Sequence, residues 1–162
     1  MTKQGLDQLK RHEAFRARKY YCSAGFLTIG YGYNLEGNYL RLPEYELQVL
    51  KQDGIKQSRA EELLKAVVAS VERDLYKALP WIVRLNEARQ AVLINMAYNL
   101  KGNVSGLLKF KRTLALIEHG DYDNAADAMM QSKWADDVKS RAVELSKQMR
   151  TGKFAGINHA AV

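Results

Sequence analysis

The sequence predicts a mainly helical α+β fold. Apolar residues recur at helical spacing over most of the chain, whereas one short segment near the N-terminus alternates around a glycine turn as a β-hairpin does. Only two prolines interrupt the 162 residues. A chain of this length buries about 70% of its unfolded surface. We therefore expect one domain, 1–162, with a small antiparallel sheet and a larger helical part.

The first third of the chain is predicted to contain a helix, a hairpin, a loop and a second helix. These are the helix Lys3–Ala14, a hairpin of Tyr20–Cys22 and Phe26–Ile29 turning at Ser23–Gly25, a polar loop Asn34–Leu42 at the lip of a cleft, and a helix from Pro43 to about Gln52. Together they predict a small sheet-containing lobe.

A long helix is predicted next. Ser58-Arg59-Ala60-Glu61 matches a capping box and precedes an apolar stripe that ends before Pro80. This helix, 58–79, is expected to join a sheet lobe, 13–57, to a helical lobe made of 1–12 and 80–162.

The helical lobe is predicted to form around Asn86–Leu100, which has almost no polar face and is expected to end at a glycine stop in Lys101–Asn103. Its polar exceptions are Asn95 and Asn99. We interpret both amides as structural, with Asn99 on the cleft floor as the functional alternative. Helices are then expected at Leu107–Glu118, Asp123–Gln131 and Val138–Met149, with breaks at Gly120-Asp121 and Trp134–Asp137 and a loose tail, Gly156–Val162.

Charge and composition limit the possible classes of partner. The net charge of +7, from 25 Lys and Arg against 18 Asp and Glu, favours anionic surfaces. A basic surface that serves only solubility would give the same balance. No basic run is interleaved with aromatic residues as in nucleic-acid modules. Neither a signal peptide nor a run of about 18 apolar residues is present, and the single cysteine excludes an internal disulfide.

The segment His12–Tyr33 is predicted to carry the chemistry. Glu13 closes the first predicted helix, and the hairpin that follows brings Cys22 and Thr28 onto a short sheet facing it. An acid that faces a hydroxyl and a thiol suits hydrolysis in which one group protonates a leaving oxygen while others hold water.

The spacing of these residues resembles a known family. Glu13, eight residues, Cys22, five residues and Thr28, followed by Ile29-Gly30-Tyr31-Gly32, is similar to the catalytic segment of the phage-type lysozymes (endolysins, glycoside hydrolase family 24). Most members have aspartate at the middle position, and a smaller group has cysteine. Later segments that fit the family in order are Ile94–Asn99, Lys133-Trp134, Ser140–Ala142 and Arg150–Phe154.

The resemblance implies a lysozyme-like fold and a muramidase that hydrolyses the β-1,4 bond between N-acetylmuramic acid and N-acetylglucosamine in bacterial peptidoglycan, for host lysis and phage release. Glu13 is then the general acid, and the Thr28 hydroxyl holds the attacking water. No metal or cofactor is implied. The partners implied are peptidoglycan, anionic envelope polymers and a separate holin, which releases a monomeric enzyme from the host cytoplasm to the cell wall.

Cys22 has several possible roles. A lone cysteine is often a small buried hydrophobe, and a neutral thiol is a poor base. Arg16, Arg18 and Lys19 are expected to favour the thiolate, and ionised Glu13 to oppose it. Water-orienting group, thiolate base and thiolate nucleophile all stay open, as does retention or inversion at the anomeric carbon.

Four further residues are candidates for supporting roles. By resemblance, Arg141 corresponds to the arginine that pairs with the catalytic glutamate. Asn99 is the polar residue that would lie on the cleft floor. Tyr33 stands where the family commonly has a histidine paired with an acid of the long helix, so that ion pair is not expected. Asp137 replaces an amide of the substrate site.

Three other functions are alternatives to this interpretation. A lytic transglycosylase would cleave the same bond and leave anhydro-muramic ends. A catalytically inactive wall-binding module would account for the missing aspartate through loss of function, and a basic nucleic-acid binder is a more distant alternative.

Overall fold

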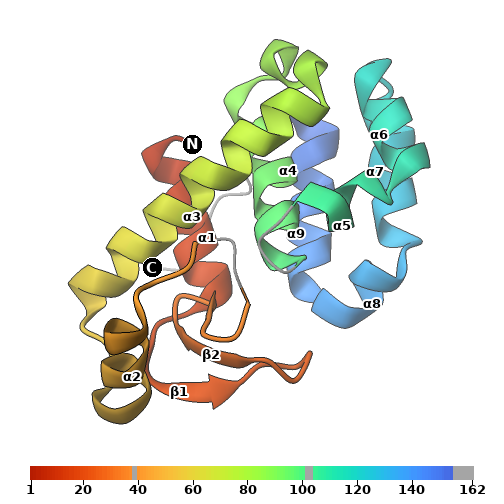
Figure 1. Cartoon of the computed structure of the whole chain (residues 1–162). Coiled ribbons are helices and arrows are strands. Elements are labelled where there is room, and N and C mark those ends of the chain that lie inside the picture. Colours follow the sequence, from red (N-terminus) through yellow and green to blue (C-terminus); the bar gives the residue numbers. More distant parts are fainter. Residues whose placement is uncertain (38–39, 101–103, 155–162) are drawn as a thin grey trace, which may run out of the picture.

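The computed structural model of the chain describes residues 1–37, 40–100 and 104–154. The described part is mainly helical with one three-stranded antiparallel sheet, as the sequence predicts (Figure 1). In chain order the elements are α1 (Lys3–Glu13), β1 (Arg16–Tyr21), β2 (Leu27–Gly30), β3 (Tyr33–Asn34), α2 (Glu44–Asp53), α3 (Gln57–Ala78), the 3-10 helix η1 (Pro80–Arg84), α4 (Glu87–Asn99), α5 (Val104–Leu108), α6 (Lys111–Glu118), α7 (Tyr122–Met130), α8 (Lys133–Val138) and α9 (Ser140–Thr151).

The sheet has the order β1-β2-β3. Tyr20 of β1 pairs with Thr28 of β2, which pairs in turn with Asn34 of β3. Paired residues point to the same face of a sheet, so these three side chains lie together. The hairpin is confirmed, but β1 begins earlier than predicted. The strand β3 was not predicted, and its second residue, Asn34, lies where the loop was expected to begin, because Tyr33 and Asn34 pair with the free edge of β2.

The long helix α3 crosses the molecule from the sheet to the far helices (Figure 1). Its predicted apolar stripe is buried. The predicted capping box is wrong: the helix begins at Gln57, and its N-cap residue Lys56 makes no side-chain cap bond. Ser58 lies inside the first turn, and the Glu61 carboxylate accepts a hydrogen bond from Lys10 Nζ at 2.6 Å instead of bonding back to the cap.

The helix α4 is the centre of the helical part, as predicted. Every residue from Ala91 to Tyr98 is buried. The helix begins after Asn86, whose side chain accepts from the Arg89 amide at 3.0 Å. It packs against α3 on one side and α9 on another (Figure 1). Side chains at the C-terminal end of α4 are therefore held rigidly where the helical part meets the sheet.

Two predictions in the C-terminal third are wrong. The expected helix Leu107–Glu118 is divided into α5 and α6, because the backbone at Phe110 leaves the helical region and its ring packs edge-to-face on Trp134, 6.4 Å between centroids. The expected break at Trp134–Asp137 is instead the helix α8, whose N-cap Ser132 accepts from the Ala135 amide. The predicted glycine stop at 101–103 and the tail 156–162 lie outside the described residues.

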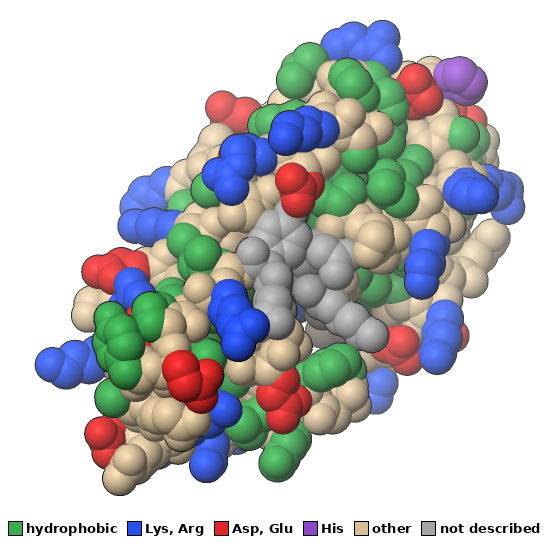
Figure 2. Space-filling model, in the orientation of Figure 1, with side chains coloured by type: hydrophobic (Ala, Val, Ile, Leu, Met, Phe, Trp, Pro, Cys, Tyr) green, Lys and Arg blue, Asp and Glu red, His purple; other side chains and the backbone are tan. Residues whose placement is uncertain are grey.

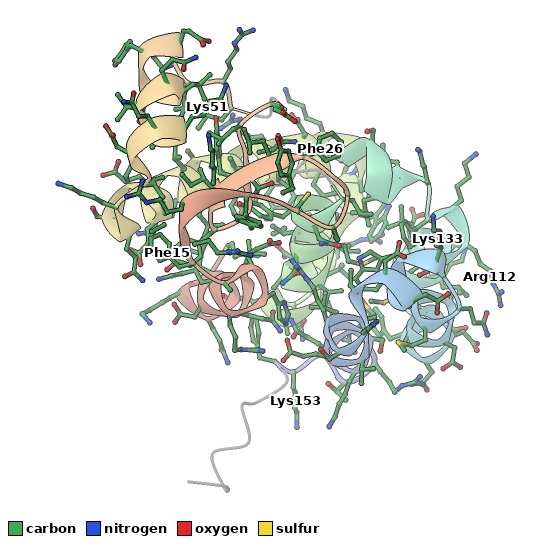
Figure 3. The ribbon with its side chains drawn as sticks, turned by 90° about the horizontal axis from the view of Figure 1, so that it is seen from below. Phe15, Phe26, Lys51, Arg112, Lys133 and Lys153 are labelled. Carbon is green, nitrogen blue, oxygen red and sulfur yellow. The ribbon has the colours of Figure 1, made fainter. Side chains whose placement is uncertain are left out.

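The basic side chains are dispersed over the face shown in Figure 2. On the face in Figure 2, Lys and Arg alternate with acidic and apolar side chains instead of forming one patch. Figure 3 shows Lys51 on α2 at one end and Arg112 and Lys133 at the other. In the part of the chain that the structure describes, no helix is long and apolar enough to cross a membrane.

Truncation of a core side chain on α4 tests the central role of this helix. Leu93 is fully buried, so Leu93→Ala should lower the free energy of unfolding by about 2–5 kcal/mol in urea denaturation. Val83, 66% exposed on η1, provides the control. Val83→Ala should change stability by no more than about 0.5 kcal/mol. Equal losses from both substitutions would contradict the assignment of α4 as the core.

Candidate active site

A cleft lies where the C-terminal ends of α1 and α4 meet the β1–β2 hairpin. Its lining comes from these elements, from the loop after β3 and from α3. The described lining residues are Glu13, Tyr20, Cys22, Ser23, Ala24, Phe26, Thr28, Gly32, Tyr33, Asn34, Gly37, Leu40, Val67, Tyr98 and Asn99. The cleft thus brings together Glu13, Cys22 and Thr28, the three residues that the sequence predicts to be catalytic.

Glu13 is the last residue of α1, and the chain turns sharply after it. Ala14 has φ +58°, and the ring of Phe15 packs on Tyr31 with 5.5 Å between centroids. Figure 3 shows Phe15 at the junction of α1 and β1. The Glu13 side chain is only 15% exposed. It is therefore fixed in position while still facing the cleft.

Each carboxylate oxygen of Glu13 has a defined neighbour. Oε1 accepts a hydrogen bond from Arg141 Nη2 at 3.0 Å. Oε2 lies against Gly32, where a Cβ atom would come within 2.5 Å of it. Gly32 also has φ +72°, a conformation that side chains disfavour. Glycine at this position is what allows the backbone to approach the carboxylate.

Arg141 reaches Glu13 because Asn95 orients it. Nε and Nη2 of Arg141 donate to Asn95 Oδ1 at 2.9 and 2.7 Å. Asn95 is fully buried on α4, and Arg141 is 10% exposed in the first turn of α9. The expected contact between Arg141 and Glu13 is present. These bonds are consistent with the structural role expected for Asn95. They also connect Asn95, through Arg141, to Glu13.

Across the cleft, Thr28 and Cys22 lie on one face of the hairpin. Thr28 is 4% exposed. Its hydroxyl lies 2.8 Å from the Phe26 carbonyl oxygen and also within hydrogen-bonding range of the Cys22 thiol. Phe26 is visible on this hairpin in Figure 3. The hydroxyl can direct its hydrogen toward either partner.

Among the supporting residues, Asn99 and Tyr33 reach the cleft and Asp137 does not. Asn99 lines the cleft, and its Oδ1 also accepts a hydrogen bond from Trp134 Nε1 at 2.9 Å. Its amide therefore makes a structural hydrogen bond and lies in the cleft at the same time. The Tyr33 hydroxyl donates to the Leu40 carbonyl at 2.5 Å and joins β3 to the lip of the cleft. Asp137 is exposed on α8 and is not among the described lining residues.

Comparison with known proteins identifies the family. The family model described as phage lysozyme matches residues 10–150, which include every cleft residue named above. The chain belongs to the phage lysozyme family.

Three relatives show how widely such segments occur. The pre-baseplate central spike protein Gp5 of Enterobacteria phage T4 is 28% identical over 161 residues, covering 91% of this chain but only 28% of that protein. A probable T4-type lysozyme 1 of Dictyostelium discoideum is 28% identical, with 90% and 93% of the two chains covered. An endolysin of Acyrthosiphon pisum secondary endosymbiont phage 1 is 27% identical, with 83% and 80% covered.

In this member of the family, the surroundings of Cys22 lower the pKa of its thiol. Partial burial, the largest single influence, raises the pKa of the thiol. Hydrogen bonds from the backbone at Phe26, Ala24 and Gly25 and from the Thr28 hydroxyl outweigh burial and hold the pKa below its ordinary value. The basic residues expected to supply this effect, Arg16, Arg18 and Lys19, are not among the main influences. The tight turn of the hairpin supplies it instead.

Sequence reasoning missed several residues of the site. Tyr98 is buried beside Gly32, and its hydroxyl donates to the Tyr31 carbonyl at 2.5 Å. Burial and the nearby charge of Glu13 raise the pKa of Tyr98 far above its usual range, so it stays a hydrogen-bond donor. Tyr98 follows Asn95 by three positions and so lies on the same face of the helix. This spacing is the feature of the sequence from which its place near the site could have been predicted. His12 precedes Glu13 in the sequence but belongs to no motif, and it lies behind the cleft against Asn95 and Glu144.

Adding a methyl group at Gly32 should displace the carboxylate. Gly32→Ala introduces a Cβ 2.5 Å from Glu13 Oε2, so lysis activity should fall at least about tenfold. Gly120→Ala is the matched control, because Gly120 has a similar φ of +78° but nothing within 4 Å of an added Cβ. Comparable loss of activity in both variants would show that backbone strain, not contact with Glu13, is responsible.

The source of the lowered thiol pKa can be tested by alkylation. Thr28→Val removes the hydroxyl and should raise the pKa of Cys22, so the midpoint of iodoacetamide alkylation rate against pH should move upward. Lys19→Ala removes one of the positive charges that were expected to favour the thiolate and should leave this midpoint unchanged. The reverse pattern would identify Arg16, Arg18 and Lys19 as the cause.

Proposed function

We propose that this protein is an endolysin, a muramidase that hydrolyses the β-1,4 bond between N-acetylmuramic acid and N-acetylglucosamine in bacterial peptidoglycan. The observation that carries the proposal is the carboxyl group of Glu13, held by Arg141 on one side of a cleft whose other side presents Cys22 and Thr28. Its membership of the phage lysozyme family supports the same reaction.

In the proposed mechanism Glu13 is the general acid. Its carboxyl group transfers a proton to the glycosidic oxygen as the bond to the anomeric carbon breaks. The transfer leaves a carboxylate, which the Arg141 guanidinium stabilises from 3.0 Å. The positive charge that develops on the sugar ring then needs either a nucleophile or a water molecule from the opposite side of the cleft.

Thr28 and Cys22 are proposed to serve the opposite side. The Thr28 hydroxyl can accept or donate a hydrogen bond and so orient a water molecule. A Cys22 thiolate can remove a proton from that water, or can attack the anomeric carbon itself. The first route inverts the anomeric configuration. In the second, the thiolate displaces the leaving oxygen to form a covalent thioglycoside, and a water molecule deprotonated by the Glu13 carboxylate then displaces the thiolate, so that the configuration is retained. A cysteine in place of the usual carboxylate would define a subgroup of the family.

The relatives favour a lytic enzyme acting on its own. Two of them are matched over 93% and 80% of their own length, and they are named as a probable T4-type lysozyme and an endolysin. The spike protein is the exception, because this chain spans 28% of its length. We therefore propose action as a monomer on peptidoglycan after release from the host cytoplasm by a holin, with the net charge of +7 favouring anionic envelope polymers. No metal or cofactor enters the proposed reaction.

Lysis of permeabilised Gram-negative cells tests the proposal in four proteins: wild type, Glu13→Gln, Cys22→Asp and Cys22→Ser, with folding checked by circular dichroism. Wild type and Cys22→Asp should lyse cells. Glu13→Gln and Cys22→Ser should lose about 10²–10⁴-fold in rate, because the first lacks the proton donor and the second lacks the thiolate that acts as base or nucleophile.

Two results would contradict parts of this proposal. A folded but inert wild type that becomes active only as Cys22→Asp would identify an inactive wall-binding module. Products lacking the mass of one added water would identify a lytic transglycosylase. The anomeric configuration of the first product, measured by NMR, distinguishes Cys22 as nucleophile from Cys22 as base.

A further inference from the structure

His12 is enclosed at the junction of α1, α4 and α9, directly behind Glu13 and Arg141. Its Nδ1 lies 3.0 Å from Nδ2 of Asn95. Its Nε2 contacts Oε2 of Glu144. The His12 side chain is only 6% exposed. One continuous chain of contacts therefore runs from Glu144 through His12, Asn95 and Arg141 to Glu13.

The donors and acceptors in this chain can be assigned from chemistry alone. An arginine side chain only donates, so the atom of Asn95 that faces Arg141 must be the amide oxygen. The amide nitrogen then faces His12 and donates to it. His12 Nδ1 must accept, and its single hydrogen is carried by Nε2, where the Glu144 carboxylate accepts it. The arrangement requires neutral His12 in one tautomer.

We propose that His12 is a positioning residue that, when neutral, orients Asn95 so that Arg141 is held against Glu13, and that releases this hold when it is protonated. The role rests on the function proposed above for Glu13. His12 does not touch the cleft, since it is absent from the described lining residues. It acts only through the amide of Asn95.

Protonation disrupts the chain because it places two donors face to face. A hydrogen on His12 Nδ1 would point at the Asn95 amide group, and the only relief on Asn95 is to exchange the positions of its oxygen and nitrogen. That exchange turns a donor toward Arg141, which then loses the acceptor of both its Nε and Nη2 bonds. Each outcome loosens the contact between Arg141 and Glu13.

The charges around His12 act in opposite directions. Glu144 and Arg141 face it from α9 and Arg11 from α1, while α4 contributes only the neutral Asn95. Burial, with Arg141 and Arg11, lowers the pKa of His12, and Glu144 raises it. Burial dominates, so the pKa lies below the ordinary value of about 6.5. The neutral state therefore prevails at neutral pH, and the switch operates as the solution becomes acidic.

Nuclear magnetic resonance tests the hydrogen-bonded chain from His12 to Arg141 by a readout that does not depend on enzymatic activity. Long-range proton–nitrogen correlations at neutral pH should show His12 with hydrogen on Nε2 only. On acidification, the Arg141 Nε–H signal should move with the same midpoint as the His12 ring, and His12→Gln should abolish that movement. Glutamine offers one acceptor and one donor but does not titrate. The proposal would be overturned if His12 is charged at neutral pH, or if the Arg141 Nε–H signal does not change as His12 is protonated. Both results can be read whether or not the protein lyses cells.

The kinetic readout is the pH profile of lysis. The wild-type rate should fall as pH drops through the pKa of His12, and His12→Gln should remove this acid limb while keeping the rate at neutral pH. His12→Leu, which can neither donate nor accept, should lose roughly ten- to hundredfold in kcat with KM nearly unchanged.

His119→Gln provides the control, because His119 is exposed after α6. This substitution should change neither the acid limb of the pH profile nor the lysis rate at neutral pH. An acid limb that is the same in wild type and His12→Gln would refute the switch. A folded wild type without any lysis would refute the proposed function instead, and the NMR result would then stand alone.

Discussion

The site depends on one contact between residues far apart in the chain, the pairing of Arg141 with Glu13. An arginine at 10% exposure and a glutamate at 15% are both largely removed from water, and neither is tolerated there without a partner. For Arg141 to contact Glu13, α1 has to end at Glu13 and α9 has to begin just before Arg141. In addition, α4 has to place Asn95 beside Arg141. The packing of three helices is thereby tied to the position of one carboxyl group.

The second constraint is the close approach of the sheet to this pair. Gly32 lets the chain pass beside Glu13 Oε2, and Gly30 has a positive φ and comes within 3.0 Å of Ala60 on α3 when a Cβ is built on it. The segment between β2 and β3 is therefore pressed against both α1 and α3. This close packing brings Thr28 and Cys22 to the side of the cleft opposite Arg141, so the two halves of the proposed chemistry face one another.

The polar residues behind the site extend this logic into the core. Gln148 on α9 bonds to Gln8 of α1 and to the Ala88 carbonyl of α4, in a buried cluster that continues toward Glu144 and His12. No buried side-chain nitrogen or oxygen in the described residues is left without a partner. Such fully satisfied networks admit few alternative arrangements. The orientation of Arg141 is consequently set by the whole α1–α4–α9 junction.

Local pattern by itself predicted most of the helices and the hairpin, because apolar period and short-range spacing are written along the chain, and the family resemblance selected Glu13, Cys22 and Thr28 as candidates, which the structure places in one cleft. Local pattern misplaced the start of α3 and missed α8 and β3, where a competing tertiary partner or a single capping bond decides. The position of Asp137 outside the cleft, the backbone source of the Cys22 pKa shift and the chain from His12 to Arg141 came only from the tertiary structure. Each depends on atoms brought together from distant segments, and spacing along one sequence carries no information on their distance or on which hydrogen-bonding atom faces which.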